Sequence, residues 1–198
     1  MSEPAYTRLE NDERRRQLLD LGADLFTRHA YDEISMAQIA REAGISKALL
    51  YHYFPSKQDY FVATLATGAD ELRRRVEPDP DLPPAEALTA AVDAYLGWIE
   101  QNAEGYEKLM QSAASVPDVR ELVEGFRGAT VDRILAGIGA TEPAARTAVR
   151  GWLWFMDGAC LDWIAHRDFE RPQLLGLLLG TLFGALMAAG VQLPAATA

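Results

Sequence analysis

The fold of this chain is indicated most clearly by residues 34–54, which read ISMAQIAREAGISKALLYHYF. Ser35 and Gln38 have the spacing of a capping box, so a short helix is expected to begin after Ser35 and to end at Gly44. Glycine at position 44 permits the positive φ that a tight turn requires. Ser46 is a second N-cap residue and predicts another short helix directly after that turn, and Ser56 is a third, which predicts a helix that runs to about Val76. The stretch therefore predicts a helix-turn-helix.

The apolar residues of this stretch can form a small buried wedge between the two short helices. These residues are Ile39, Ala40, Ala43, Ile45 and Leu50. Spacing alone also allows two short helices of an ordinary helical domain, with the neighbouring aromatic residues in its core.

The second short helix has an outward surface that suits DNA. In a helix-turn-helix the N-terminal part of this helix enters the major groove. The predicted outward residues are Lys47, Ala48, Leu49, Tyr51 and His52. Hydroxyl, imidazole and amide donors can reach phosphate oxygens without adding much formal charge. Ala48 or Leu49 can contact a thymine methyl group.

The overall charge of the chain argues against DNA binding. The sequence has 29 acidic and 19 basic residues and a formal net charge of -10. Within residues 1–60 acidic residues match or exceed basic ones, so a DNA-facing basic patch has to be small. Arg14, Arg15 and Arg16 fit either an arm that contacts the DNA backbone or a solvated helix surface.

The rest of the chain has helical periodicity and almost no strand signals. Helices are expected near 12–29, 57–76, 85–102, 104–114, 118–138, 143–167 and 172–190 in addition to the two short ones. Four prolines within residues 78–84 cannot continue a helix and mark the best candidate domain boundary. The fold class is therefore all-α, with about nine helices in two parts.

The run from Ser35 to Phe61 resembles the DNA-binding signature of the tetracycline-repressor (TetR) family. The resemblance is strongest in IAREAGISK and LYHYFPSK and covers about residues 12–62, roughly a quarter of the chain. It implies a helix-turn-helix domain over residues 1–56, a connecting helix over 57–77 and an effector-binding and dimerisation domain over 78–198. It also implies a homodimer on a palindromic operator, with a small-molecule effector.

The resemblance assigns roles to individual positions. By matching position, Ser35, Tyr51, Tyr53 and Lys57 would contact phosphates, whereas Lys47, Ala48 and His52 would lie nearest the bases. Family members often have Gly-Thr where this chain has Ala48-Leu49. A hydroxyl is lost there, so the operator sequence of relatives cannot be transferred to this chain.

The C-terminal segment 174–191 is 18 residues long and carries no charge. That length is at the threshold for a transmembrane helix, and Gly176, Gly180 and Gly184 have the spacing of packed membrane helices. The soluble alternative is a helix buried between two subunits. The segment that follows it has no Lys or Arg anchor, and the resemblance implies a dimer through the helices near 143–167 and 172–190. Both points favour the soluble alternative. A cytoplasmic location is expected because the N-terminal residues include no apolar stretch that could serve as a signal peptide.

Aromatic residues of the C-terminal part suggest either core and dimer packing or the wall of an effector pocket. The candidate pocket residues are Tyr95, Trp98, Tyr106, Met110, Trp152, Phe155, Met156 and Asp157. Asp157 would contact the ligand or pair with an arginine such as Arg127 or Arg133. The effector is expected to be apolar or aromatic, and the acidic residues leave a cationic one open.

Enzymatic chemistry finds little support in the sequence. The three histidines are far apart, and no metal-binding spacing, nucleophile elbow or phosphate-binding glycine loop is present. No catalytic residue, metal or cofactor is therefore predicted. The single cysteine, Cys160, rules out an internal disulfide and is expected in the core, with a redox role as the alternative.

Three functional hypotheses follow from these patterns. The first is a ligand-responsive regulator, expected from the resemblance to be a repressor. The second is a small-molecule binding protein whose helix-turn-helix is vestigial, which the acidic charge favours. The third is a regulator tethered to a membrane.

Overall fold

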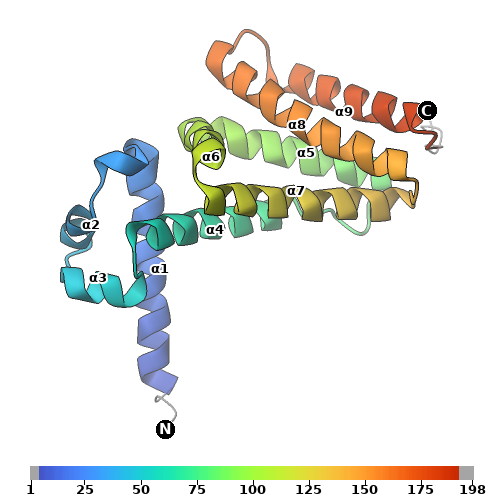
Figure 1. The fold of residues 1–198 in the computed structure, drawn as a ribbon. Helices are drawn as coiled ribbons and strands as arrows, with labels where there is room; N and C mark the ends of the chain where they lie inside the picture. The colour runs from blue at the N-terminus through green and yellow to red at the C-terminus, as the bar shows by residue number, and fades with distance from the viewer. Residues whose placement is uncertain (1–4, 192–198) are drawn as a thin grey trace.

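A computed structural model describes residues 5–191; the ends of the two predicted domains, residues 1–4 and 192–198, lie outside the described residues. The described chain is entirely helical, which confirms the all-α prediction (Figure 1). Its elements are α1 (Ala5–Arg28), the 3-10 helix η1 (Tyr31–Glu33), α2 (Met36–Glu42), α3 (Lys47–Tyr53), α4 (Lys57–Arg75), α5 (Pro84–Gln101), α6 (Ala103–Ser115), α7 (Pro117–Ile138), α8 (Pro143–His166) and α9 (Arg171–Ala188).

Local sequence signals account for most helix starts. The hydroxyl oxygens of Ser35, Ser46 and Ser56 accept the backbone N–H three residues later, over 3.3, 3.1 and 3.0 Å. These three bonds confirm the predicted N-caps. Helices α5, α7 and α8 each begin with a proline, whose missing N–H would have no partner in the first turn.

Two local features differ from the sequence expectations. Helix α1 begins at Ala5 rather than near residue 12, and η1 is not predicted at all. The apolar pattern that marks α1 starts only at Leu18, because residues 12–16 are exposed and carry no periodic signal. The 3-10 turn is closed by the Glu33 side chain, which accepts the Ala30 N–H at 3.0 Å.

The N-terminal core forms where α1 crosses α4. A Cβ atom at Gly22 of α1 would lie 2.8 Å from Tyr60 Oη and closer still to Thr64 Oγ1, so only glycine allows this approach. The Tyr60 hydroxyl donates to the Leu18 carbonyl at 2.5 Å, and burial raises its pKa. The crossing fixes α1 against α4 and carries α2 and α3 on its outer side (Figure 1).

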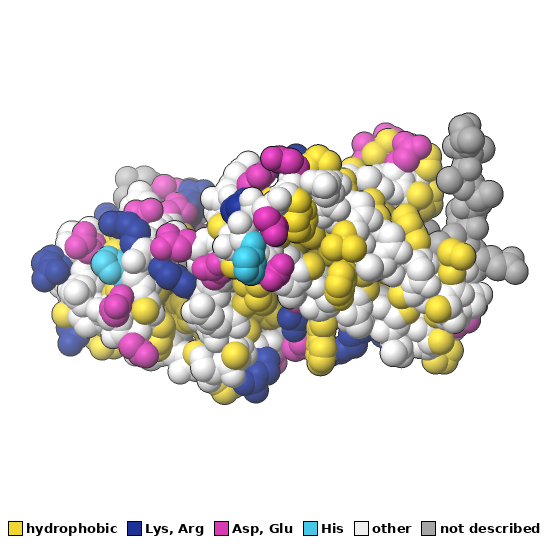
Figure 2. All heavy atoms as spheres, turned by 90° about the horizontal axis from the view of Figure 1, so that it is seen from above, with side chains coloured by type: hydrophobic (Ala, Val, Ile, Leu, Met, Phe, Trp, Pro, Cys, Tyr) yellow, Lys and Arg dark blue, Asp and Glu magenta, His cyan; other side chains and the backbone are white. Residues whose placement is uncertain are grey.

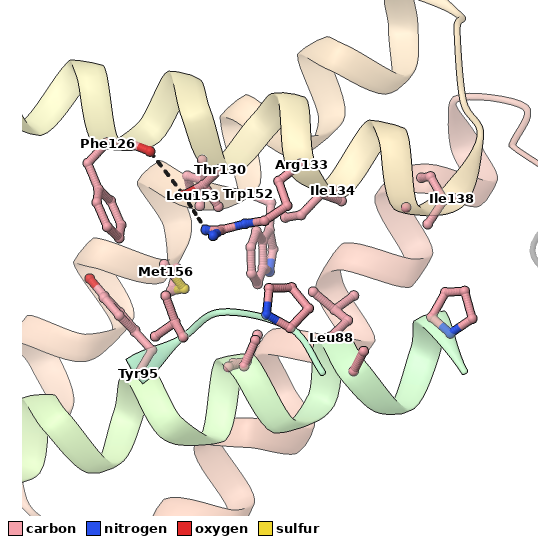
Figure 3. Close-up of a pocket in the computed structure, with 17 residues that line it drawn as sticks. Leu88, Tyr95, Phe126, Thr130, Arg133, Ile134, Ile138, Trp152, Leu153 and Met156 are labelled. Atoms are coloured by element: carbon pink, nitrogen blue, oxygen red, sulfur yellow. Dashed lines mark hydrogen bonds between the residues drawn. The ribbon is translucent and has the colours of Figure 1, made fainter. Parts of the chain in front are cut away.

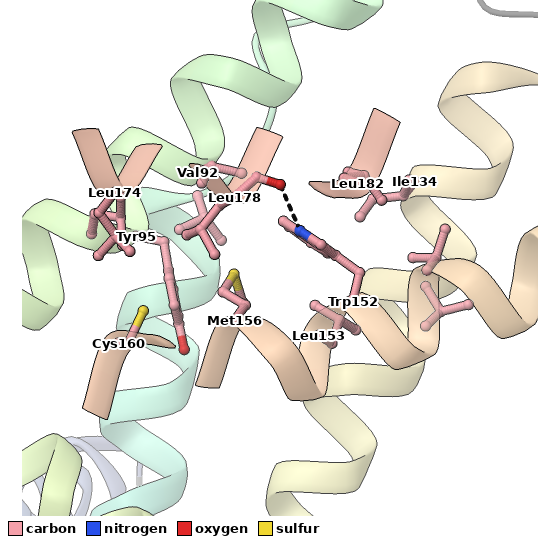
Figure 4. Packing of buried hydrophobic residues seen from close by; sticks show 14 of the residues in the cluster. Val92, Tyr95, Ile134, Trp152, Leu153, Met156, Cys160, Leu174, Leu178 and Leu182 are labelled. Atoms are coloured by element: carbon pink, nitrogen blue, oxygen red, sulfur yellow. Dashed lines mark hydrogen bonds between the residues drawn. The ribbon is translucent and has the colours of Figure 1, made fainter. Parts of the chain in front are cut away.

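The C-terminal core lies between α5, α7, α8 and α9. Leucines 174, 178, 182 and 186 of α9 are fully buried at a spacing of four residues. Trp152 of α8 donates from Nε1 to the Leu178 carbonyl at 2.8 Å, which ties α8 to α9 (Figure 4). One stripe of α9 is therefore committed to the core of its own subunit.

Helix α9 was also the candidate membrane span. Within residues 5–191 it is the one helix whose length and apolar composition would let it cross a membrane, and 22% of it is buried inside the subunit. Its buried leucine stripe packs against α8 and α5, as the core helix of a globular domain does.

Helix α4 connects the two cores. Its first half contributes Tyr60 and Phe61 to the N-terminal core, and its last residues pack with the C-terminal core through Leu72 and Val76. A second connection joins the domains at the α6–α7 corner, where Val119 is buried in the N-terminal core. The two domains therefore contact each other at two places, along α4 and at the α6–α7 corner.

Candidate DNA-binding surface and ligand cavity

The helix-turn-helix has the predicted local geometry. Gly44 adopts φ +66°, and the Ile45 N–H donates to the Ala40 carbonyl at 3.0 Å, which closes the turn after α2. Ile39, Ala40 and Leu50 are buried at the crossing of α2 and α3, while Ala43 and Ile45 are half-buried. The wedge therefore forms as predicted, and it fixes the direction of α3.

The outer face of α3 is open to solvent. Lys47, Ala48, Leu49, Tyr51 and His52 are all exposed, as the sequence predicts for a surface that meets a partner. Leu49 and Tyr51 remain 39% and 41% exposed although both are large and apolar. Large apolar side chains left exposed in this way often mark a binding surface.

Four of the eight predicted DNA-binding residues line one hollow. The hollow has a volume of about 380 Å³ and lies between η1, α2 and α3, and it brings together Ser35, Lys47, Tyr51 and Lys57. Lys57 Nζ donates to the Tyr31 carbonyl at 2.9 Å and lies 4.1 Å from the centre of the Tyr31 ring. The ammonium group is thereby held in place at the hollow.

Acidic groups also border the hollow that contains Lys47 and Lys57. Asp32 and Glu33 also line it, so its net charge is small. The pKa of Tyr31 is raised by burial and further by Asp32 and Asp59. A phosphate would therefore be bound by a few directed donors and not by a broad positive field.

The remaining predicted contact residue, Tyr53, lies differently. It is half-buried, and its hydroxyl donates to Asn11 Oδ1 of α1 at 3.1 Å. Its ring meets the His52 ring edge-on, with 5.6 Å between their centroids. To contact a phosphate, the Tyr53 hydroxyl would have to exchange its Asn11 partner.

A largely apolar cavity of about 190 Å³ opens in the C-terminal domain between α5, α7 and α8 (Figure 3). Three of the predicted pocket residues line it, namely Tyr95, Trp152 and Met156. Sequence reasoning missed most of the wall, which consists of small and aliphatic residues of α5 and α7 with Phe126 and Arg133. Aliphatic residues of this kind have the same pattern as ordinary core residues, so the sequence holds no signal that separates them.

A second, smaller cavity of about 60 Å³ lies beside the first. It is lined by six of the predicted pocket residues: Tyr95, Trp98, Tyr106, Met110, Met156 and Asp157. Tyr95, Phe126, Leu153 and Met156 line both cavities and form the partition between them. The smaller cavity also touches α4 at Gly68, Ala69 and Leu72. A ligand near the partition would therefore be close to the connecting helix.

Phe155 is the one predicted pocket residue that lines neither of these cavities. It is 41% exposed on the outer face of α8, beside Trp154, which is 60% exposed. The helical repeat of α8 turns residues 152 and 156 inward and residue 155 outward.

Asp157 has its countercharge inside the protein. Its Oδ1 accepts the Tyr106 hydroxyl at 2.9 Å, and its Oδ2 accepts Nε and Nη2 of Arg127 at 3.0 and 2.5 Å. Of the two arginines suggested by the sequence, Arg127 is thus the partner. Burial, reinforced by the Tyr95 and Asp157 charges, raises the pKa of Tyr106. Asp157 is therefore committed to a network and has no spare charge for a cationic ligand.

Cys160 lies next to this network and is fully buried. Burial, with a smaller contribution from the Asp157 charge, raises the pKa of its thiol to about 12. A thiol in this state reacts slowly because the thiolate is the nucleophile. The geometry favours the core role over the redox role.

The outer face of α8 and α9 is apolar and rich in glycine. Exposed large side chains on it are Trp154, Phe155, Leu177 and Met187. Exposed glycines on it are Gly151, Gly158, Gly176, Gly180 and Gly184, and a Cβ at any of them would meet open space. Figure 2 looks onto this side of the molecule and shows apolar side chains spread over it.

Two family models match the chain. Residues 18–64 match the model described as "Bacterial regulatory proteins, tetR family", and residues 84–185 match "Tetracyclin repressor-like, C-terminal domain". The two matches fall on the helix-turn-helix domain and on the domain that contains both cavities.

Individual relatives agree with these matches. The chain is 35% identical to the "HTH-type transcriptional activator FasR" of Mycolicibacterium smegmatis over 83% of this chain and 77% of the relative. It is 32% identical to the "HTH-type transcriptional regulator HbdR" of an Aromatoleum species over 57% of this chain and 51% of the relative. A solved tetR-family transcriptional regulator from Streptomyces coelicolor is 31% identical, with a TM-score of 0.79 over 90% of this chain and 82% of that one.

Proposed function

Because this chain belongs to the TetR family of bacterial transcriptional regulators, we propose that it is a homodimeric, cytoplasmic repressor that a small-molecule effector releases from a palindromic operator. Family membership makes the chain a DNA-binding regulator and not an enzyme. The dimer, the effector and the sign of regulation are the proposed parts. Relatives of this chain include both an activator, FasR, and a repressor, KstR of Rhodococcus jostii.

The observation that carries the DNA-binding part is the exposed face of α3 beside the hollow that holds Lys47 and Lys57. In the proposed complex Ser35, Tyr51, Tyr53 and Lys57 contact phosphates. Lys47, Ala48 and His52 lie nearest the base edges, with Leu49 available for an apolar contact. Directed contacts of this kind explain how a chain with a net charge of -10 binds DNA.

The dimer part rests on the apolar face of α8 and α9. Exposed glycines let two helices approach closely, and Trp154 and Met187, at 60% and 66% exposed, would become buried. A face of this composition is costly to leave in water and typical of a lasting contact between subunits. In a two-fold dimer the same face of both subunits meets.

The effector part rests on where the two cavities lie. The smaller cavity touches α4, and α7 reaches the N-terminal core through Val119. Gln58 of α4 also donates to Asp118 of α7 at 2.8 Å. An effector that moves the cavity walls would therefore tilt the two recognition helices, and operator affinity depends on their spacing.

A fluorescence-anisotropy titration tests the DNA-binding part. The purified protein is titrated with its own upstream intergenic DNA and with scrambled DNA, at 50 and 200 mM salt. One phosphate-bound lysine in each subunit, Lys57, places about two cations on the phosphates, so affinity should fall about tenfold between these salt concentrations.

Two variants separate the kinds of contact. Tyr51→Phe should weaken binding and leave the salt slope unchanged, because it removes a neutral donor. Lys57→Gln should weaken binding and also lower the slope, by about one per subunit. Leu82→Ala, exposed in the α4–α5 turn, is the control and should bind normally. Equal affinity for both DNAs with no effect of Tyr51→Ala would contradict the assignment of α3.

The second candidate function is ligand sequestration by a protein whose helix-turn-helix is vestigial. The net charge of -10 is the observation that favours it. It predicts ligand binding with no salt-dependent binding to either DNA in the same titration, and no enrichment of any fragment of the genome.

A further inference from the structure

The larger C-terminal cavity contains a single charged side chain, Arg133, among the described residues that line it. The other polar groups of the wall are already engaged. Thr130 Oγ1 donates to the Phe126 carbonyl at 2.9 Å, and Trp152 Nε1 donates to the Leu178 carbonyl. The Tyr95 hydroxyl is directed to the Tyr106 hydroxyl at 3.4 Å.

The Arg133 guanidinium is poorly paired for a half-buried charge. Its hydrogen bond within residues 5–191 runs from Nη2 to Thr130 Oγ1 at 3.4 Å, and no carboxylate of the described chain lies within 4.0 Å of it. A guanidinium has five N–H donors, so most of them are left over. Figure 3 shows the side chain reaching from α7 into the cavity.

No carboxylate near Arg133 forms an ion pair with it among the described residues. Burial lowers its pKa, the nearby Arg73 lowers it further, and Glu77 opposes both without forming an ion pair. Arg73 is itself paired with Asp70 at 2.5 Å. By contrast Arg127, which lies six residues earlier on α7, is paired with both Asp157 and Glu124.

From this contrast we infer that the effector is an amphipathic carboxylate, whose anionic head binds Arg133 and whose apolar body fills the rest of the larger cavity. The inference rests on the proposed function, because it names the ligand class of the proposed effector site. The planar fork of a guanidinium matches a carboxylate and can bind it through two hydrogen bonds. One arginine balances one negative charge, so a monoanion fits better than a phosphate.

The cavity limits the size of the apolar body. An apolar cavity of about 150 Å³ holds benzene, and this one measures about 190 Å³. A single ring or a short alkyl chain with a carboxylate therefore fits, and a longer chain would have to displace the partition at Met156.

Three probes with the same tail and different heads test the inference: octanoate, octanamide and octylamine. Isothermal titration calorimetry measures their binding to the full-length wild type and to Arg133→Met, which keeps an apolar stem. Octanoate should bind the wild type most tightly, and Arg133→Met should weaken it about tenfold to a hundredfold. Octanamide, which accepts a hydrogen bond but carries no charge, should lose much less affinity in Arg133→Met than octanoate does.

Glu77→Gln is the matched control. It removes the nearest opposing charge and should leave octanoate binding as tight as in the wild type, or tighter. The thermal unfolding of both variants is measured to check that each variant is folded. Octanoate binding that does not change in Arg133→Met overturns the inference, as does octylamine or octanamide binding at least as tightly as octanoate, or a wild type that binds none of the three.

Different outcomes would contradict the proposed function and the inferred ligand class. If octanoate binds through Arg133 but leaves the affinity for operator DNA unchanged in the anisotropy titration, the ligand class stands and effector-driven release is contradicted. If octanamide displaces the DNA as well as octanoate does, the release mechanism stands and the anionic head is overturned.

Discussion

Asp157 and Arg133 show how the environment of a single polar residue determines its role. Both were candidates for the same ion pair in the sequence, yet Asp157 pairs with Arg127 at 2.5 Å and Arg133 faces the cavity. The choice depends on how α7 is rotated against α8, and sequence spacing does not determine that rotation. Serine caps, by contrast, act within three residues and were predicted correctly at Ser35, Ser46 and Ser56.

The Asp157 network should stabilise the C-terminal domain. Asp157→Asn removes the negative charge and leaves Arg127, whose side chain is 19% exposed, with Glu124 as its remaining partner. We expect the free energy of unfolding in urea to fall by about 1–3 kcal/mol. Asp162→Asn is the control on the exposed side of the same helix, and it should change stability by less than about 0.5 kcal/mol. Equal effects of the two variants would contradict the network's role.

Cys160 gives a pH prediction. Its thiol pKa is about 12 in the folded chain, above the ordinary value of 9.0, because the group is buried. A folded-state pKa that is raised contributes stability below the unfolded pKa, and this contribution is lost as pH rises through the interval from 9.0 to about 12.

Replacing the thiol tests this assignment. Cys160→Ala should therefore lose less stability than the wild type between pH 8 and pH 10, when both are unfolded in urea. A native thiol that reacts with a thiol reagent within minutes at pH 8 would show that Cys160 is accessible and would contradict its place in the core.

At the scale of elements, the helices were predictable and their faces were only partly so. Within residues 5–191 the order and type of the nine α-helices follow from periodicity, prolines and caps, whereas η1 and the first turns of α1 carry no such signal. Helices with apolar residues on both the buried and the exposed face were harder to interpret. Phe155 was expected in the pocket, but its position on α8 turns it outward, next to Trp154.

The crossing of α1 and α4 depends on Gly22. Gly22→Ala would push a methyl group into Tyr60 and Thr64, and we expect a loss of about 1–3 kcal/mol in the free energy of unfolding. Gly125→Ala is the matched control, because this position on α7 has open space around it and should gain about 0.5–1 kcal/mol from helix propensity. A neutral Gly22→Ala would mean that the two helices are not held this closely.

At the scale of the whole molecule, the exposed face of α8 and α9 should hold two subunits together. Trp154→Glu would bury two charges in the dimer, so we expect a monomer by analytical ultracentrifugation at micromolar concentration. Leu82→Glu is the control, because it places the same charge at an exposed apolar residue away from this face, and it should remain a dimer. A Trp154→Glu protein with the dimer mass would exclude this face as the interface.

The family and the DNA-binding surface were accessible from sequence because a helix-turn-helix is encoded locally, within residues 34–57. The cavity proposed as the ligand site was not, because its wall comes from α5, α7 and α8 and consists mostly of residues that resemble ordinary core residues. The total charge does not reveal the DNA-binding surface either, because four of the proposed contact residues gather in one hollow whose position composition does not show.

The most direct test of the central claim, a dimer that reads DNA with α3, is the sequence that the protein selects from fragments of its own genome. We expect enrichment of a palindrome whose half-sites are about 10 base pairs apart, centre to centre, or a multiple of that spacing. The enrichment should be lost in Tyr51→Ala. Recovered fragments that share no symmetric motif, or that Tyr51→Ala recovers equally well, would contradict the claim.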